Sequence, residues 1–121
     1  MKLLRKLGLL LGGITALLIP QAKGANLGLK DGVFDGATYD AYYGPVQVEV
    51  TIQGGRIVAA NALQYPNHRR TSVDINRQAL PYLQREVVQA QSARVNAISG
   101  ATLTSRAYIG SVADALQQAS K

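Results

Sequence analysis

The sequence predicts an α+β domain in which an antiparallel β-meander packs against helices. Apolar and polar residues alternate over 46–53, which is typical of a strand with one buried and one wet face. Gly54-Gly55 follows directly as a two-residue hairpin signal. Apolar residues then recur at helical spacing in two later segments, 75–88 and 109–116. The 121 residues are enough for one domain.

The first 24 residues have the layout of a secretory signal peptide. Three basic residues precede an apolar run over 7–20, and the small residues Ala22 and Gly24 suit a cleavage site after Gly24. The apolar run is shorter than the ~20 residues that a spanning helix needs. We therefore expect residues 1–24 to be a signal peptide and residues 25–121 to form the domain, exported to the periplasm or the outer face of the cytoplasmic membrane. An uncleaved N-terminal anchor is the alternative.

Charge and cysteine content exclude several classes of function. The net charge is +6, but four of the 13 basic residues lie in the predicted leader, so nine basic and seven acidic residues leave +2 on the domain. Nucleic-acid binding, which needs a basic face, is not indicated. The absence of Cys excludes disulfides, a lipid anchor on Cys, Cys-linked haem and thiolate-bound iron–sulfur clusters. His68 is the only His, so a zinc site is not expected.

The strands are expected in the first half of the domain. Residues 31–36 read as a turn, a strand and a turn, and 38–43 continue as a strand up to the turn at Gly44-Pro45. The alternating strand 46–53 and its partner 56–63 then form a hairpin. Together these segments predict an antiparallel meander.

Helices are expected in the second half. After a polar loop over 64–72, the helical spacing over 75–88 is interrupted by Pro81, which predicts either a kinked helix or two short helices. Residues 94–98 are expected to form a short strand. The last helix is expected to run from about Thr104 to Ala119, with a hydroxyl residue as its N-cap.

A segment rich in hydroxyl groups lies between the last predicted strand and the last helix. Its sequence is Ser99-Gly100-Ala101-Thr102-Leu103-Thr104-Ser105, which is too polar for a core strand. Gly100 permits a sharp turn, and free N–H groups at the start of the following helix form an anion site. The chain is therefore expected to turn here and begin a helix whose N-terminus is open to a phosphate.

Ser-Gly-Ala-Thr-Leu-Thr resembles the flavinylation motif of FMN-binding domains, which include the NqrC and RnfG subunits of membrane redox complexes and small stand-alone FMN-binding proteins. Residues 31–36 also resemble the start of that family's first strand, with Phe34 in the aromatic place. The resemblance implies that a flavin transferase joins FMN through its phosphate to Thr104. It also implies that the neighbours in the motif bind the cofactor: Ser99, Gly100, Ala101, Thr102, Leu103 and Ser105.

Other residues are secondary candidates for the site. The family motif often opens with Asp three residues before its Ser, where this chain has Asn96, which keeps the hydrogen-bonding oxygen and loses the charge. Arg69 or Arg70 could reach the phosphate or border the flavin ring. Alternatively, both could lie in a solvated loop. Arg106 could add positive charge near the phosphate or face solvent. Three tyrosines could stack on the flavin or belong to core or surface: Tyr42, Tyr43 and Tyr65.

The chain shows no arrangement of base, nucleophile or metal ligands, so redox chemistry would have to come from a cofactor. We predict an electron-transfer flavoprotein of the cell envelope, an electron carrier more than a stand-alone enzyme. Its expected partners are a flavin transferase and a membrane-bound or extracytoplasmic redox protein. The alternative is a secreted accessory domain of the same fold with non-covalent flavin or none. A self-sufficient flavin reductase ranks last, because the sequence shows no NAD(P)H site.

Overall fold

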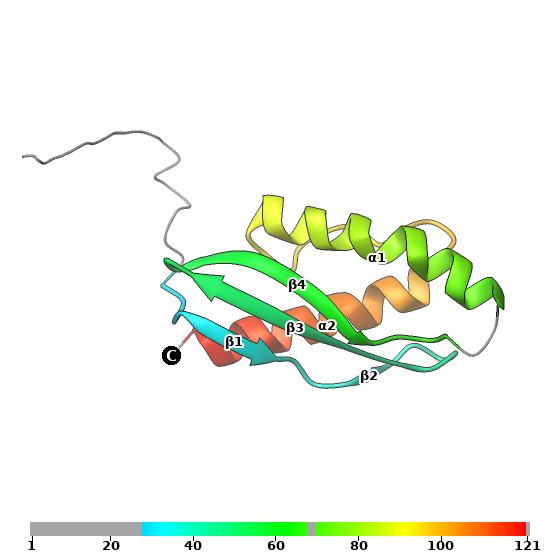
Figure 1. The fold of residues 1–121 in the computed structure, drawn as a ribbon, viewed down its shortest axis with the longest axis horizontal. Coiled ribbons are helices and arrows are strands. Elements are labelled where there is room, and N and C mark those ends of the chain that lie inside the picture. The colour runs from blue at the N-terminus through cyan, green and yellow to red at the C-terminus, as the bar shows by residue number, and fades with distance from the viewer. Residues whose placement is uncertain (1–27, 68–69, 121) are drawn as a thin grey trace, which may run out of the picture.

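An antiparallel sheet with two helices on one face makes up the fold (Figure 1). The computed structural model describes residues 28–67 and 70–120, so the predicted signal peptide lies outside the described residues. Described elements follow the order β1 (Gly32–Asp35), β2 (Tyr39–Asp40), β3 (Pro45–Gln53), β4 (Arg56–Gln64), α1 (Arg70–Ala90) and α2 (Thr102–Ala119). The α+β class is confirmed. Neither described helix is long and apolar enough to cross a membrane.

β3 is the central strand of the sheet. Its alternate residues are buried at 0–1% exposure: Val46, Val48, Val50 and Ile52. β4 pairs with β3 through the Gly54-Gly55 turn, as predicted. β1 and β2 both pair with the other edge of β3, so they act as one strand interrupted at residues 36–38. The meander is confirmed, although the predicted strand 38–43 is reduced to Tyr39–Asp40.

The interruption between β1 and β2 brings the sheet against α2. A Cβ atom on Gly36 would overlap the backbone oxygen of Ser111, so only glycine fits at this close approach. The Gly36 N–H donates to the Val48 carbonyl oxygen at 2.9 Å. The Val48 N–H in turn donates to Ser111 Oγ at 2.9 Å, which fixes α2 to the middle of β3.

The core lies between β3 and the two helices. Leu83 and Val87 of α1 and Val112 of α2 are fully buried with the β3 valines. Burying a Val or Leu side chain contributes about 1.5–3 kcal/mol. Tyr108 of α2 is also fully buried, and its hydroxyl donates to the Ala60 carbonyl oxygen of β4. Desolvation raises the pKa of the Tyr108 phenol well above its ordinary value.

α1 runs without a break through Pro81. Of the two expected arrangements, two short helices are therefore wrong. A proline inside a helix frees the carbonyl of the residue four positions earlier, which here is Arg77. Both Pro81 and Arg77 are exposed, so water can satisfy that carbonyl.

The predicted strand over 94–98 is wrong, because this segment is irregular. Its backbone groups find partners close by in sequence: the Val95 N–H donates to the Ala93 carbonyl, and the Ile98 N–H donates to Ser105 Oγ. Val95 and Ile98 still pack against the core as partly buried side chains. Their apolar character therefore reflects packing without strand pairing.

Candidate flavin-binding site

The hydroxyl-rich segment makes a turn and then begins α2. Gly100 has φ of +86°, a conformation that favours glycine. α2 starts at Thr102, two residues earlier than expected, and its N-cap is Ala101, with no side-chain capping hydrogen bond. The predicted hydroxyl N-cap is therefore wrong, and Thr104 lies in the first helical turn. The N–H groups of a first turn have no intrahelical acceptor, so they remain available to an anion.

Two neighbouring hydroxyls in this turn have different surroundings. Ser105 is 0% exposed, and its Oγ donates to the Ala101 carbonyl at 2.7 Å while accepting from the Ile98 N–H at 3.0 Å. Thr104 is 7% exposed and lines a cavity. Among hydrogen bonds between described residues, none involves the Thr104 hydroxyl. Ser105 holds the turn together, whereas the Thr104 hydroxyl is unused.

The cavity beside Thr104, which we call the threonine cavity, has a volume of about 530 Å³. It lies between the start of α2, the start of α1 and the loop after β2. It is lined by Tyr43, Ser72, Ile75, Asn76 and residues 100–104, none of which is charged.

A second cavity, the acidic cavity, has a volume of about 640 Å³ and adjoins the first. Its lining includes the carboxylate residues Asp74 and Glu86 of α1 and the segment 96–101. The two cavities share Ile75 and the Gly100-Ala101 backbone. An anionic phosphate is repelled by carboxylates, so the threonine cavity is the more favourable place for one.

The structure gathers most of the predicted motif around these cavities. Thr102, Leu103 and Thr104 line the threonine cavity, Gly100 and Ala101 line both, and Ser99 and Asn96 line the acidic cavity. Ser105 lines neither, because it points into the turn.

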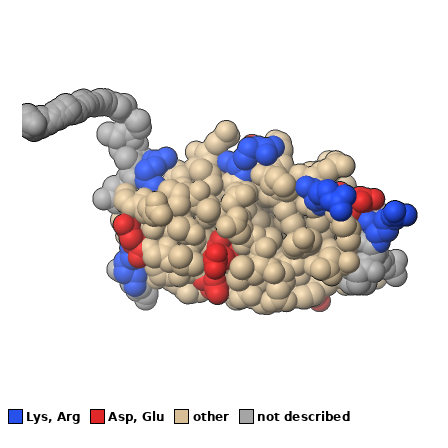
Figure 2. All heavy atoms as spheres, in the orientation of Figure 1, with Lys and Arg blue, Asp and Glu red and all other residues tan. Residues whose placement is uncertain are grey.

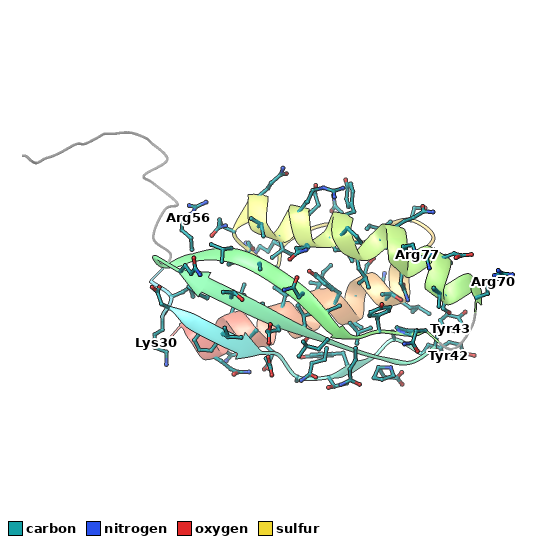
Figure 3. The ribbon with its side chains drawn as sticks, viewed as in Figure 1. Lys30, Tyr42, Tyr43, Arg56, Arg70 and Arg77 are labelled. Atoms are coloured by element: carbon teal, nitrogen blue, oxygen red, sulfur yellow. The ribbon has the colours of Figure 1, made fainter. Side chains whose placement is uncertain are left out.

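The secondary candidates are more dispersed. Arg106 is exposed on α2, and Arg69 lies outside the described residues. Arg70 is exposed at the start of α1, at the same end of the molecule as Tyr43 (Figure 3). Tyr42 packs edge-on against Tyr43 with ring centroids 4.8 Å apart. Tyr65 lines two other cavities, one between β4 and α1 and one at the end of β4.

Sequence reasoning missed the contribution of α1 to the site. Ser72, Ile75 and Asn76 form one wall of the threonine cavity. One signal was present in the sequence: Asn76 lies three residues before Ala79 and seven before Leu83, on the stripe of α1 that faces the core. A polar residue on such a stripe indicates a specific partner.

Charge is sparse on the side of the molecule where the strands lie in front of α2. Figure 2 shows a mostly uncharged surface there, with Lys and Arg side chains toward its edges. On this side of the described chain, Lys and Arg side chains are therefore spread along the edges and do not gather in one patch.

The fold and the site define a domain that can hold a phosphorylated ligand at a helix N-terminus beside an uncharged cavity. A model of the family described as "FMN-binding domain" matches residues 41–117. That range covers more than half of the chain and includes both cavities, so this chain belongs to the FMN-binding domain family.

One solved structure supports the fold. The chain is similar to the crystal structure of the CPE2226 protein from Clostridium perfringens, with 21% sequence identity and a TM-score of 0.59 over 75% of this chain and 88% of that chain. At this identity the likeness shows the fold alone. A comparison with curated proteins found no match.

The residues of the threonine cavity fit FMN. Its volume lies in the range of about 300–1,000 Å³ that is usual for small-molecule sites. The uncapped start of α2 offers N–H donors to a phosphate, and Gly100 presents no side chain there. Tyr43 and Leu103 are 46% and 43% exposed at the cavity and offer apolar surface to a ring.

Proposed function

We propose that this protein is an electron carrier of the cell envelope with FMN esterified through its phosphate to Thr104. The observation that carries this proposal is the contrast between the two hydroxyls. Ser105 Oγ makes two hydrogen bonds within the turn, whereas the Thr104 side chain lines the cavity and its hydroxyl makes no hydrogen bond to a described residue. Bound flavin supplies one- and two-electron redox chemistry. The described residues supply no group of three or more potential metal ligands that would suggest another redox centre.

Attachment requires an activated flavin nucleotide, in which the FMN phosphate is part of a phosphoanhydride. The Thr104 Oγ–P bond forms as the phosphoanhydride P–O bond breaks. The hydroxyl proton passes to a base of the flavin transferase, and the nucleotide leaving group carries away the anhydride oxygen. The uncapped N-terminus of α2 favours the negative charge of the resulting phosphodiester.

The export signal predicted over residues 1–24 supports the envelope location. Outside the cytoplasm, flavin that dissociates from a shallow site is lost by dilution. A covalent phosphoester removes that loss and leaves the flavin ring unaltered. A membrane-bound or extracytoplasmic redox protein would then exchange electrons with the ring.

The proposal predicts that Thr104→Ala abolishes the covalent flavin while the fold survives. Thr104→Ser retains it, because the acceptor is a hydroxyl in both cases. The measurement is intact-mass spectrometry after co-expression with a flavin transferase, with fragment masses to place the added FMN on the chain. Thr104 is not an N-cap and its hydroxyl has no described partner, so Thr104→Ala is expected to lower the free energy of unfolding by less than about 1 kcal/mol.

Two results would contradict the attachment site or its recognition. An FMN-sized mass that persists in Thr104→Ala shows that another residue is the acceptor. If the wild-type protein gains no mass while the same transferase modifies a second substrate, Asn96 is the residue that we expect to prevent recognition by the transferase. Asn96 is exposed at the acidic cavity, so Asn96→Asp changes its charge without disturbing the core. Restored attachment in Asn96→Asp supports the proposal.

A second candidate is an accessory domain that holds FMN without a covalent bond. The burial of Thr104 favours it, because a transferase must reach a side chain that is only 7% exposed. Denaturing gel electrophoresis separates the two candidates: covalent flavin remains fluorescent on the protein band, and non-covalent flavin is lost.

A further inference from the structure

Asn76 is a buried polar side chain with one unused atom. It is 1% exposed, and its Nδ2 donates to the Pro66 carbonyl oxygen at 2.8 Å. Its Oδ1 is closed off from solvent and has no hydrogen-bond partner. Such unpaired buried groups are rare in native proteins and are unfavourable until a partner is supplied.

The identity of the unpaired atom follows from its neighbour. If the amide were rotated by half a turn, Oδ1 would face the Pro66 carbonyl, and two acceptors would oppose each other. The orphaned atom is therefore the oxygen, and the missing partner is an N–H or O–H donor. Oδ1 is closed off in this conformation, so a donor reaches it only when the surrounding side chains move, as they can when a ligand enters the adjoining cavity.

The position of Asn76 points to the ligand of the threonine cavity. Asn76 lines two cavities: the threonine cavity, which Thr104 lines from α2, and a second cavity between α1 and β4. The threonine cavity is the one that contains the proposed attachment residue, so we consider its ligand. In FMN the ribityl chain joins the phosphate to the ring, so its hydroxyls are the donors nearest to the phosphate. The only N–H donor of oxidised flavin lies on the far edge of the ring system.

We propose that Asn76 Oδ1 accepts a hydrogen bond from a ribityl hydroxyl of the flavin and thereby selects flavins that carry the polyol chain. The inference rests on the proposed function in placing the phosphate at Thr104. For the ligand to reach Oδ1, the lining of the threonine cavity must rearrange, because Oδ1 is closed off in this conformation. Tyr43 and Leu103 line the same cavity and are half-exposed, so they can move with little loss of packing. A site with a buried acceptor discriminates against an analogue that lacks the matching donor.

The test compares riboflavin with lumiflavin, which has a methyl group in place of the ribityl chain. Neither carries a phosphate, so the comparison isolates the polyol. Fluorescence titration of the unmodified protein, made without a transferase, is expected to show riboflavin bound about tenfold more tightly, which corresponds to one well-made buried hydrogen bond. Asn76→Leu is expected to remove most of this preference by weakening riboflavin and leaving lumiflavin unchanged.

The matched control is Gln78→Leu, two residues further along α1 at an exposed position of the acidic cavity. It makes the same kind of change and is expected to keep the wild-type preference. Asn76→Ser is a second variant, which leaves room for water if Asn76→Leu fails to fold. If both variants are unfolded, equal affinity of the wild-type protein for the two flavins still overturns the inference.

Equal affinity of the wild-type protein for the two flavins, including failure to bind either up to the limit of its solubility, overturns the inference. Equal loss of both flavins in Asn76→Leu also overturns it. The covalent proposal is tested separately by the added mass on Thr104. If the protein prefers riboflavin but gains no mass, the role of Asn76 stands and the phosphoester proposal fails. If the protein gains the mass on Thr104 but does not prefer riboflavin, the phosphoester proposal stands and the role of Asn76 fails.

Discussion

At the scale of single residues, the site depends on which hydroxyls are committed to the fold. Three hydroxyls within four residues, on Thr102, Thr104 and Ser105, look alike in the sequence. The structure separates them: Thr102 is exposed, Thr104 faces the cavity, and Ser105 is enclosed by the turn that it stabilises. The sequence could predict the motif but not this division, because a hydroxyl's partner depends on the fold around it.

Ser105→Ala is predicted to destabilise the protein without removing the attachment site. It deletes two hydrogen bonds and leaves the Ile98 N–H without its acceptor, which should lower the free energy of unfolding by about 2 kcal/mol. Urea unfolding measures this change. Intact mass after co-expression with the transferase, below the unfolding transition, should still show the FMN adduct. An unchanged midpoint of unfolding would contradict the role of Ser105 in the turn.

At the scale of elements, the sequence was most informative where one periodicity dominates. The alternation of β3 and the Gly54-Gly55 turn predicted the hairpin with nearly the observed bounds. The strand expected over 94–98 failed because apolar residues there pack against the core while the backbone pairs locally. An apolar run shows that side chains are buried, and it does not show what the backbone bonds to.

Contacts between distant elements were beyond prediction from one sequence. Asp31, before β1, accepts hydrogen bonds from the N–H groups of Gly54 and Gly55, more than 20 residues away. These bonds lower the pKa of the Asp31 carboxyl below its ordinary value. They explain why an acidic residue precedes the first strand, which sequence analysis could only describe as a turn signal.

Gly36→Ala is predicted to disrupt the junction between the sheet and α2. Its new Cβ would overlap the Ser111 backbone oxygen, and the helix backbone cannot move without leaving the core. The expected loss in the free energy of unfolding is about 3 kcal/mol, at the upper end for overpacking. Thermal unfolding followed by circular dichroism measures it.

Gly110→Ala is the matched control for this prediction. Its Cβ would lie 3.2 Å from the ring of Tyr39, which is 41% exposed and can turn away. Alanine also favours the helix by about 1 kcal/mol over glycine, so little net change is expected. Equal destabilisation by the two substitutions would mean that the close approach of Gly36 to Ser111 does not make Gly36→Ala more costly than another Gly→Ala substitution.

At the scale of the whole molecule, a few polar contacts at the edge of or within an apolar core fasten both helices to one face of the sheet. Ser111 joins α2 to β3, and the Tyr108 hydroxyl joins α2 to β4. α1 instead meets the sheet at β4, where Gln84 Oε1 accepts from the Ala60 N–H. The threonine cavity and the acidic cavity lie between α1 and the segment that leads into α2. A rigid frame therefore fixes the distance between the α1 wall and Thr104.

Tyr108 makes the stability of this frame sensitive to alkaline pH. Burial raises the pKa of its phenol in the folded state, whereas the unfolded phenol ionises near its ordinary value of about 10. Above that pH the unfolded state releases a proton that the folded state keeps. The contribution of Tyr108 to the free energy of unfolding is therefore complete below pH ~10. As pH rises further, the free energy of unfolding falls by up to about 1.4 kcal/mol per pH unit because of this group.

Tyr108→Phe is predicted to remove that alkaline loss. At pH 7 it should cost about 1 kcal/mol, because the Ala60 carbonyl loses its donor. Above pH ~10 the variant lacks the ionising group, so its stability declines less steeply and the two curves converge. Urea unfolding at intervals from pH 7 to beyond pH ~11 gives both curves. Tyr82→Phe, at a position that is 47% exposed, is the control and should run parallel to the wild type. Parallel curves for Tyr108→Phe and the wild type would show that the buried phenol does not couple the fold to pH, and equal stabilities at pH 7 would show that the bond between α2 and β4 is replaceable.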